Sequence, residues 1–377
     1  MELVGFDKKR ANKVMEKKGL DVMILTSSEN VFYTSGLPVR HIEYNPILFV
    51  LSNQYPSLSV IQRDAEDFVI AWAMFDPNLT WIKDFSGVLS KEQAISMLIS
   101  KVGQNKKSGL KIGIESNMPL YLVEALSGAY PHEDFVLADD IMMELRSVKS
   151  AEEIRRIREA TRISEKTIST LIEHLEEGIS DLELIRLAKI TTLNEGGIGT
   201  NHLTLSIGDS DPEAPGTGRR IKKGEITRFD TGAVYQGYVS DVSRHGCLGR
   251  VPVKAKRIVE YIVDLQQACV DAIKPGVTAG EIEDKINKRL ESAKILVFPM
   301  GHGVGLNTEE SHFIPASSWG TRDMVFKSGM VFDLEFWSPY EPYNNRLIGM
   351  EDTYLVRDNG CERITKMDRV IFSKQGV

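Results

Sequence analysis

Residues 226–247, ITRFDTGAVYQGYVSDVSRHGC, constrain the fold most strongly, because two acidic residues lie in what otherwise has the composition of two strands. A chain reversal centred on residues 235–236 would place Asp230 directly opposite Asp241, with Cβ atoms roughly 4.5–5.5 Å apart. Carboxylates that close repel each other, so the pair requires a shared proton, a cation or exposure to solvent. On its own the stretch favours an exposed surface hairpin, and the rest of the chain has to decide.

The length of the chain, 377 residues, suits two domains of roughly 100–200 residues each. Its net charge of −7 and its pI near 5.7, without a run of Lys or Arg, argue against nucleic acid as the main partner. The first residues lack the apolar core of a signal peptide, and no later run approaches the ~18–20 apolar residues of a membrane span. We therefore expect a cytoplasmic protein without membrane association. The three cysteines have no CxxC spacing, which predicts reduced thiols rather than disulfides or a zinc–thiolate site.

Residues 1–142 are predicted to form a smaller α/β domain, because short apolar strands alternate with helices. No glycine-rich phosphate loop interrupts the pattern, which argues against a nucleotide-binding domain. Residues 27–46 contain a glycine and two prolines and are expected to form a loop. We expect strands at 21–26, 47–51, 57–62, 68–73, 110–115 and 135–137, and helices at 91–102 and 120–126.

Residues 143–377 are predicted to form a second domain of the α+β class, an antiparallel sheet backed by helices on one side. The pair Ser150 and Glu153 has capping-box spacing and predicts that a helix begins there. A glycine-rich turn is expected at 195–201. Beyond the acidic hairpin, we expect helices at 181–195, 254–273 and 278–290 and strands at 330–337 and 351–356.

Three further residues suggest that the acidic hairpin is not an isolated surface feature. His302 lies within GHGVG, where a glycine-rich turn would leave the imidazole accessible. Glu335 lies in the apolar strand GMVFDLEFW, where an unpaired glutamate is costly to bury. Glu351 begins the next strand, and a reversal centred on Tyr343 would place the two glutamates opposite each other. Four carboxylates and one imidazole form an oxygen and nitrogen set typical of paired divalent cations.

Such a pair of cations lies roughly 3.5–4 Å apart and lowers the pKa of a shared water toward neutrality, so the natural chemistry is hydrolysis. At this point the sequence resembles the pita-bread metallopeptidases, a family that includes Xaa-Pro dipeptidase (prolidase), aminopeptidase P, methionine aminopeptidase and the metal-free creatinase. The motifs that carry the resemblance span most of the chain: NVFYTSGL, ELRSVKSAEEI, FDTGAVYQGYVSDVSR, PGVTAGEIE, GHGVGL, KSGMVFDLE and MEDTYLVRDNGCERIT. The N-terminal motifs favour the prolidase and aminopeptidase P branch.

The resemblance implies a pita-bread catalytic domain after a creatinase-like N-terminal domain, which would cap the site and support a homodimer. It implies two divalent metal ions, with Mn, Co or Zn as candidates. Asp230 would hold one ion, Asp241 and Glu351 would bridge both, and His302 and Glu335 would hold the second. Glu335 would also act as general base and acid. Arg40 and His41 lie in a loop that would approach the neighbour's cleft, either to recognise a substrate carboxylate or as part of a solvated loop.

The sequence departs from this family around the expected cage. Glu309 and Glu213 stand where the peptidases usually have histidines, and a carboxylate cannot stabilise an oxyanion unless it is protonated. The expected Arg two residues before the last ligand is Gly349, and the residues after Glu335 are Phe and Trp rather than Pro and Gly. Asp333 adds an acid on the strand face of Glu335, and His202 and His312 could each replace a missing imidazole although their spacing differs.

Three hypotheses follow. The first is a two-metal hydrolase that cleaves Xaa-Pro bonds in dipeptides or short peptides. The second keeps the scaffold but acts as a metal-dependent hydrolase or lyase on a small zwitterion, because glutamates replace the usual histidines and could recognise a cationic group. The third is a non-catalytic binding module, which the retention of all five ligand residues disfavours.

Overall fold

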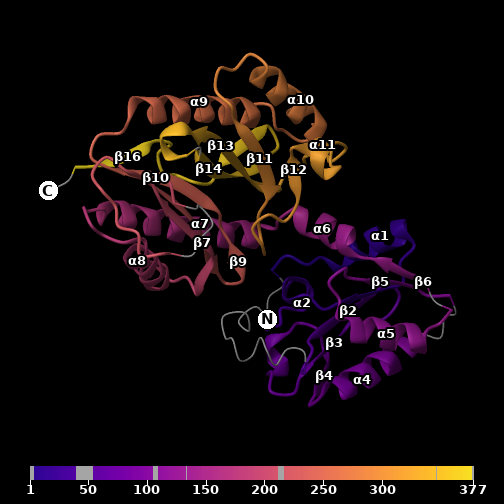
Figure 1. The fold of residues 1–377 in the computed structure, drawn as a ribbon. Helices are drawn as coiled ribbons and strands as arrows, with labels where there is room; N and C mark the ends of the chain where they lie inside the picture. The colour runs from indigo at the N-terminus through magenta and orange to yellow at the C-terminus, as the bar shows by residue number, and fades with distance from the viewer. Residues whose placement is uncertain are drawn as a thin grey trace. The chain divides into compact units, whose positions relative to one another are not determined.

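The computed structural model describes residues 4–39, 54–104, 109–132, 134–210, 216–344 and 346–375. The chain divides into two compact units, Met1–Arg146 and Ser147–Val377, where the sequence placed the boundary at 142/143 (Figure 1). The strand expected at 47–51 and the candidate residues Arg40, His41 and Glu213 lie outside the described residues. None of the helices among the described residues is long and apolar enough to span a bilayer.

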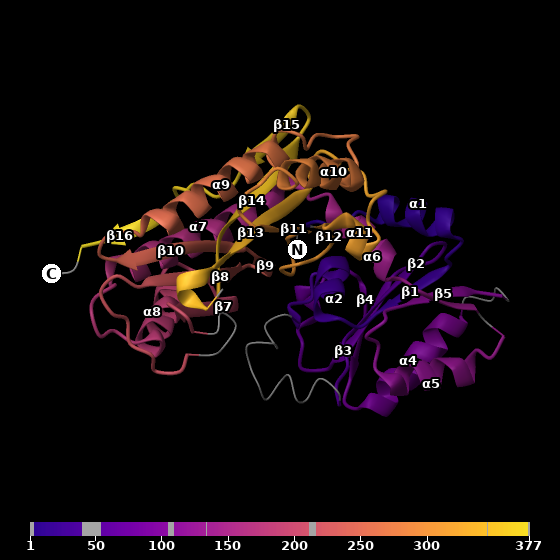
Figure 2. The same cartoon turned by 45° about the horizontal axis from the view of Figure 1, so that its top comes forward.

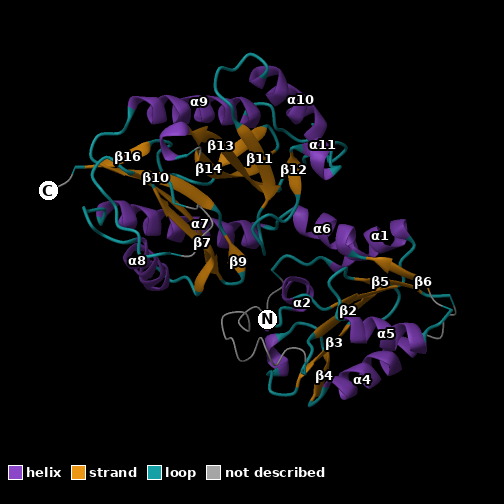
Figure 3. Cartoon of the chain, in the orientation of Figure 1, coloured by secondary structure: helices purple, strands orange, loops and turns teal. Residues whose placement is uncertain are grey.

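The first unit is an α/β layer built on a six-stranded mixed sheet with the order β4-β3-β2-β1-β5-β6 (Figure 3). The β1–β2 and β2–β3 pairs are antiparallel, whereas β3–β4, β1–β5 and β5–β6 are parallel. Its core packs sheet residues such as Val60 and Phe68 against residues such as Leu98 of α4 and Leu122 of α5. The elements are α1 Lys8–Lys18, β1 Val22–Leu25, α2 Ser28–Ser35, β2 Leu58–Gln62, β3 Phe68–Trp72, η2 Pro77–Leu79, β4 Asp84–Val88, α4 Lys91–Gly103, β5 Lys111–Ile114, α5 Leu120–Ala129, β6 Asp134–Leu137 and α6 Asp139–Ser147.

The expected loop at 27–46 is wrong over its first third, where the chain forms α2 (Ser28–Ser35). The helix has a clear start signal, since the Ser27 side chain accepts a hydrogen bond from the backbone N–H of Asn30. Gly36 ends it in the left-handed conformation, with φ of 77°. Helix α2 is only eight residues long, too short for a hydrophobic period to stand out, so only its caps could have predicted it.

The second unit is a ten-stranded, mainly antiparallel sheet backed by helices, as expected. The order of its main path is β12-β11-β13-β14-β10-β8-β7, with β15, β16 and β9 pairing to β14, β10 and β8. Only β16 runs parallel to its neighbour. The elements are α7 Ala151–Glu173, α8 Asp181–Asn194, β7 Gly199–Ile207, β8 Ile226–Tyr235, β9 Tyr238–Val239, β10 Val242–Leu248, α9 Val253–Val270, α10 Ala279–Leu290, β11 Phe298–Gly303, β12 His312–Ile314, α11 Ala316–Trp319, β13 Val331–Tyr340, η3 Glu341–Tyr343, β14 Arg346–Arg357, β15 Gly360–Arg363 and β16 Ile371–Lys374.

Both helix pairs cover the same face of this sheet. Phe229 of β8 packs with α7 and α8, while Leu334 of β13 and Met350 of β14 pack with α9 and α10 (Figures 1 and 2). Successive side chains of a strand point to opposite faces. Each of these core residues is followed in sequence by an acidic one: Asp230, Glu335 or Glu351. The three acidic side chains therefore project from the opposite face, which the helices leave open.

Two segments expected to be turns belong to this sheet. The turn at 195–201 ends at residue 198, and β7 begins at Gly199. GHGVG is not a turn at His302, because Gly301, His302 and Gly303 end β11. A Cβ on Gly301 would lie 2.8 Å from the Phe313 ring, so close packing, rather than a change of chain direction, requires glycine there.

The open face is held in register from behind by a buried ion pair. Arg244 of β10 and Asp352 of β14 are both fully buried, and the guanidinium donates to the Asp352 carboxylate. It also donates to the backbone carbonyls of Ser243 and Glu351, at 2.8 and 2.6 Å. One side chain thus ties together two strands that carry site residues.

We expect Arg244→Met to lower the free energy of unfolding by up to about 3–5 kcal/mol, because it removes the hydrogen-bonded partner of the buried Asp352 charge and leaves it only the longer pairs with Arg363 and Arg369, at 3.7 and 3.9 Å. Arg357→Met, which removes an exposed pair with Glu362, should cost less than about 1 kcal/mol. Urea unfolding followed by circular dichroism compares the two variants. An equal loss in both would contradict the role given to Arg244.

Candidate metal centre

The candidate residues lie on two neighbouring cross-strand rows of the open face. The first row runs through the paired positions Thr204, Asp230, Ser243, Glu351, Glu335 and Met300 of β7, β8, β10, β14, β13 and β11. In the second row, His202 pairs with Gly232 of β8, Thr353 with Asp333 of β13, and His302 with both Asp333 and His312. The sheet thereby gathers residues that are up to 149 positions apart along the chain, from His202 to Glu351.

The predicted register of the first hairpin is wrong by two residues. Asp230 pairs with Ser243, because the reversal occurs at Gln236 and Gly237, with φ of 48° and 86°. Two consecutive positive φ values are typical of the tight turns that join twisted strands. Because the side-chain period of a strand is two, a two-residue shift leaves Asp230 and Asp241 on the same face. The aspartates are therefore still neighbours, though diagonal rather than directly opposed.

The predicted register of the second hairpin is confirmed. Glu335 pairs with Glu351, and the connection contains the short helix η3, which ends at Tyr343. The tyrosine hydroxyl accepts a hydrogen bond of 2.8 Å from the backbone N–H of Ile226. The loop of the second hairpin is thus attached to the start of the strand that carries Asp230.

Seven side chains form three overlapping groups of potential metal ligands. Within each group, ligand atoms of all members lie within 4.8 Å of one another. The groups share Asp241 and His302, so they form one continuous set rather than three separate sites. The groups are His202–Asp230–Asp241, Asp241–His302–Asp333 and His302–Glu335–Glu351.

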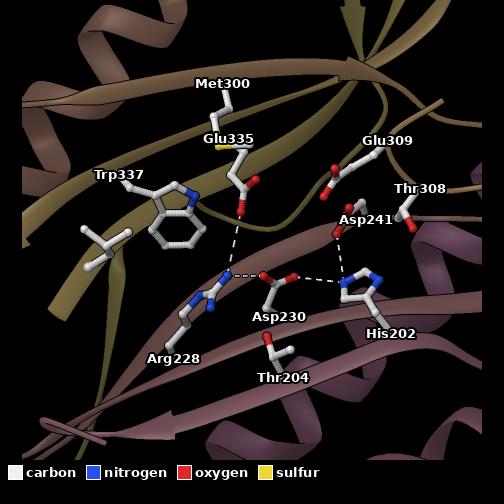
Figure 4. A pocket seen from close by; sticks show the side chains of 11 residues that line it. His202, Thr204, Arg228, Asp230, Asp241, Met300, Thr308, Glu309, Glu335 and Trp337 are labelled. Atoms are coloured by element: carbon white, nitrogen blue, oxygen red, sulfur yellow. Dashed lines mark hydrogen bonds and ion pairs between the residues drawn. The ribbon is translucent and has the colours of Figure 1, made fainter. Parts of the chain in front are cut away.

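His202 is placed at the centre although its spacing along the chain does not match the family pattern. Its Nε2 lies 3.0 Å from Asp230 Oδ1 and 2.9 Å from Asp241 Oδ1 (Figure 4). Burial on its own lowers the pKa of His202, but the two carboxylates outweigh burial and raise that pKa well above its usual range. A Cβ on Gly232 would lie 2.7 Å from the His202 ring, so the glycine provides the space for it.

Arg228 is a residue that sequence reasoning missed. It forms an ion pair with Asp230 and lies 3.7 Å from Glu335 Oε1, with its guanidinium 4.3 Å from the centre of the Trp337 ring (Figure 4). Gly349, where the family usually has arginine, has no room for a side chain, since a Cβ would lie 2.2 Å from Trp337. The guanidinium thus comes from β8 instead of β14. The sequence did contain a signal for Arg228: it stands two residues before Asp230 in a predicted strand, so both side chains point to the same face.

Burial and mutual repulsion disfavour the charged form of two of the grouped carboxylates, Glu335 and Glu351. Burial, followed by Asp230 and Asp241, raises the pKa of Glu335 to about 8. Burial, followed by Asp241 and Glu335, raises the pKa of Glu351 well above its usual range. Asp230 is the exception, because Arg228 and His202 overcome burial and lower its pKa. These carboxylates can all be charged together only if positive charge compensates them.

The donor set fits divalent cations. In the part of the chain that the structure describes, neither Glu351 carboxylate oxygen has a hydrogen-bond partner, and neither does His302 Nε2. Buried polar atoms of folded proteins almost always have a partner, so orphaned ones at one place indicate a ligand. Hard oxygen donors with one or two imidazoles suit Mn²⁺, Co²⁺ or Zn²⁺.

Glu309 and His312 lie at the rim of the cage. Glu309 has a positive φ of 53°, unusual for a residue other than glycine, and its Oε2 lies 3.0 Å from His312 Nε2. The His312 ring stacks on Trp319 with centroids 4.0 Å apart and lies 5.8 Å from the His302 ring. The structure therefore brings His312 beside a proposed ligand, and the carboxylate of Glu309 orients it.

A pocket of about 330 Å³ opens onto this face, a volume typical of small-molecule sites. In Figure 4, Arg228 and Trp337 lie on one side of the cavity and His202 and Glu309 on the other, with Asp230 and Glu335 between them. Besides Arg228, sequence reasoning did not identify five of the lining residues as site residues, because their side chains carry no chemistry that marks them in isolation. These are Thr204, Met300, Thr308, Trp337 and Leu347.

A family model described as Metallopeptidase family M24 matches residues 155–358, which contain the whole cage. The chain belongs to metallopeptidase family M24. A model described as Creatinase/Prolidase N-terminal domain matches residues 8–148. The M24 membership confirms the expected family, and the family's metal dependence agrees with the donor set of the open face.

Relatives of this M24 protein match it over two thirds of its length or more. A Xaa-Pro dipeptidase of Pyrococcus horikoshii is 27% identical over 376 residues, covering 98% of this chain and 99% of the relative. The Xaa-Pro dipeptidase of Pyrococcus furiosus is 30% identical over 266 residues, covering 68% and 74%. A dipeptidase structure from Pyrococcus horikoshii has a TM-score of 0.83 at 20% identity, covering 97% and 99%. An X-Pro aminopeptidase structure from Thermotoga maritima has a TM-score of 0.79 at 21%, covering 98% and 99%. Both structures share the fold.

We expect Gly232→Ala to disturb the M24 centre directly. The added Cβ would lie 2.3 Å from the carbonyl oxygen of Ser240 and 2.7 Å from the His202 ring, so one of them must move. Overpacking of this kind costs about 1–3 kcal/mol of stability. Gly128→Ala in α5 is the control, because a Cβ there meets no atom within 4 Å. Denaturant titrations that gave both variants the stability of the parent would contradict the packing argument.

Proposed function

We propose that this chain hydrolyses the Xaa–Pro bond of dipeptides or short peptides with the help of divalent metal. The proposal rests on one continuous set of potential ligands, Asp230, Asp241, His302, Glu335 and Glu351, of which Asp230, Asp241 and Glu335 line the pocket. The Xaa-Pro dipeptidase of Pyrococcus horikoshii, alike over 98% of this chain, supports the substrate class. A pocket of about 330 Å³ fits a substrate of dipeptide size.

The proposed ligand roles follow the layout of the sheet. Asp230 would hold one cation, His302 and Glu335 the other, and Asp241 and Glu351 would contact both. Mn²⁺, Co²⁺ and Zn²⁺ are the candidates for these two positions. When bound, a divalent pair supplies a water molecule of lowered pKa and polarises the scissile carbonyl.

Glu335 is proposed as the general base and acid because it is the cage carboxylate with the best access to the pocket. Its side chain is 13% exposed, against 8% for Asp230 and 1% for Glu351. A carboxylate at that position can accept the proton of the attacking water and pass it to the leaving proline nitrogen. Arg228 beside it partly offsets the repulsion from the other carboxylates.

The first unit completes the proposal. We propose that residues 1–142 cap the catalytic domain, 143–377, and support a homodimer, as the creatinase-type N-terminal domain implies. The substrate contacts suggested for Arg40, His41 and Glu213 stay predictions, and so does a cytoplasmic location.

One observation favours a second candidate, a metal-dependent hydrolase or lyase acting on a small zwitterion. The pocket carries a cationic group, Arg228, on one wall and an anionic one, Glu309, on the other. A substrate with a carboxylate and a quaternary or cyclic ammonium group would match both walls.

A peptide panel combined with metal analysis separates the two candidates. We expect purified protein to bind divalent metal, to cleave Ala-Pro, to leave Pro-Ala intact, and to lose activity on chelation until Mn²⁺, Co²⁺ or Zn²⁺ is restored. Including Ala-Pro-Ala tests the length of the substrate. Turnover of a quaternary or cyclic amino-acid derivative with all three peptides inert would support the second candidate. Absence of both metal and turnover would refute each of them.

Glu335→Gln keeps the shape of the side chain but removes the proton acceptor. We expect kcat to fall by about 10²–10⁴-fold, the usual contribution of a general base or acid. Glu341→Gln is the matched control, because that side chain is 81% exposed and contacts only Lys254 among the described residues. Steady-state kinetics on Ala-Pro compares them, and near-normal turnover by Glu335→Gln would refute the assignment.

A further inference from the structure

Asp333 is a buried acid that is not one of the five proposed ligands and has no role in the proposed mechanism. It lies in β13 two residues before Glu335 and pairs with His302 on one side and Thr353 on the other. Its side chain is fully buried, and neither carboxylate oxygen has a hydrogen-bond partner within the described ranges. The next residue, Leu334, packs in the core beneath α9, so Asp333 projects from the same open face as Glu335.

The surroundings of Asp333 contain further donors. Ligand atoms of Asp241, His302 and Asp333 all lie within 4.8 Å of one another. His302 Nε2 is itself a buried atom without a hydrogen-bond partner among the residues described. His302 also belongs to the group with Glu335 and Glu351, so Asp333 is connected through His302 to the five proposed ligands.

A divalent cation accounts for this arrangement better than packing does. A buried carboxylate without hydrogen bonds is destabilising, and the neighbouring Asp241 adds repulsion. A carboxylate used only to brace the cage would be expected to accept a hydrogen bond from a neighbour, as Asp352 does from Arg244. A cation between Asp241, His302 and Asp333 would satisfy the orphaned atoms of both His302 and Asp333 at once.

We propose that Asp333 is a sixth protein ligand of this centre, sharing a divalent cation with Asp241 and His302. The inference rests on the proposed function, because it presumes that the cage binds divalent metal. It departs from the five-ligand set implied by the resemblance. An additional carboxylate makes this position richer in hard oxygen donors, which favours Mn²⁺ relative to the softer Zn²⁺.

Two substitutions test whether position 333 contacts metal. Asp333→Asn preserves size and removes the charge, and we expect it to weaken Mn²⁺ binding, measured by calorimetry, by about tenfold or more. Asp333→Cys replaces the carboxylate by a thiol that is a strong ligand for Co²⁺. In the Co²⁺-loaded protein, a directly ligating thiolate gives a sulfur-to-cobalt charge-transfer band in the near ultraviolet, whereas a thiol that does not touch the metal gives none.

Matched controls separate ligation from a change in packing. Thr353→Cys places a thiol at the cross-strand partner of Asp333, also fully buried but outside the three donor groups. Asp181→Asn alters a buried acid that binds the backbone N–H groups of Thr217 and Gly218. We expect no cobalt band in Thr353→Cys and unchanged Mn²⁺ affinity in Asp181→Asn.

A cobalt band confined to Asp333→Cys, with weakened Mn²⁺ binding in Asp333→Asn, supports the inference. Unchanged Mn²⁺ affinity in a folded Asp333→Asn overturns it, and so does a band of equal strength in both cysteine variants. If Asp333→Cys does not fold by circular dichroism, the Asp333→Asn titration decides. If the parent protein binds metal and cleaves Ala-Pro, and the Asp333 variants bind metal as the parent does, only the sixth ligand is refuted. A parent that binds no metal refutes the proposed function as well.

Discussion

The mutual repulsion of buried carboxylates on one sheet face is the constraint on which the rest of this structure depends. Asp230, Asp241 and Glu351 are buried and the Glu335 side chain is only 13% exposed; all four lie on the open face of the sheet. Burial and the neighbouring aspartates raise the pKa of Glu335 to about 8, whereas Arg228 and His202 outweigh burial at Asp230 and lower its pKa. Divalent cations would resolve the conflict, and the carboxylate oxygens of Glu351, which have no hydrogen-bond partner among the described residues, are consistent with that.

Such a cage requires rigid support, and the sheet provides it from the opposite face. The helix pairs α7–α8 and α9–α10 cover only the apolar side, so alternation along each strand separates core from chemistry. Gln266 of α9 donates to the carbonyls of Leu334 and Met350, residues adjacent to Glu335 and Glu351. Together with Arg244, it fixes the backbone next to site residues, which limits their freedom to move apart.

The polar residues around the proposed ligands are where this chain departs most from the family pattern. In place of an arginine on β14 it has Gly349 against Trp337, and the guanidinium comes from Arg228 on β8. His202, on β7, brings an imidazole to the aspartate pair although its distance along the chain differs from the family pattern. The room available at the site, rather than the position of a residue along the chain, decides which residue supplies a guanidinium or an imidazole there. A side chain from any neighbouring strand can reach the same point.

The sequence by itself determined the α/β and α+β units, most helix bounds, the face that carries the acids and the five-residue cage, because strand alternation, capping boxes and acidic spacing are local signals. It did not predict helix α2, strand β7 or the strand at His302, whose signals are short or resemble turns. Only the tertiary structure decided the Gln236–Gly237 turn, the reach of His202 and the place of Arg228. These depend on strand pairing and on the volume of neighbours such as Trp337, which act between residues distant in sequence.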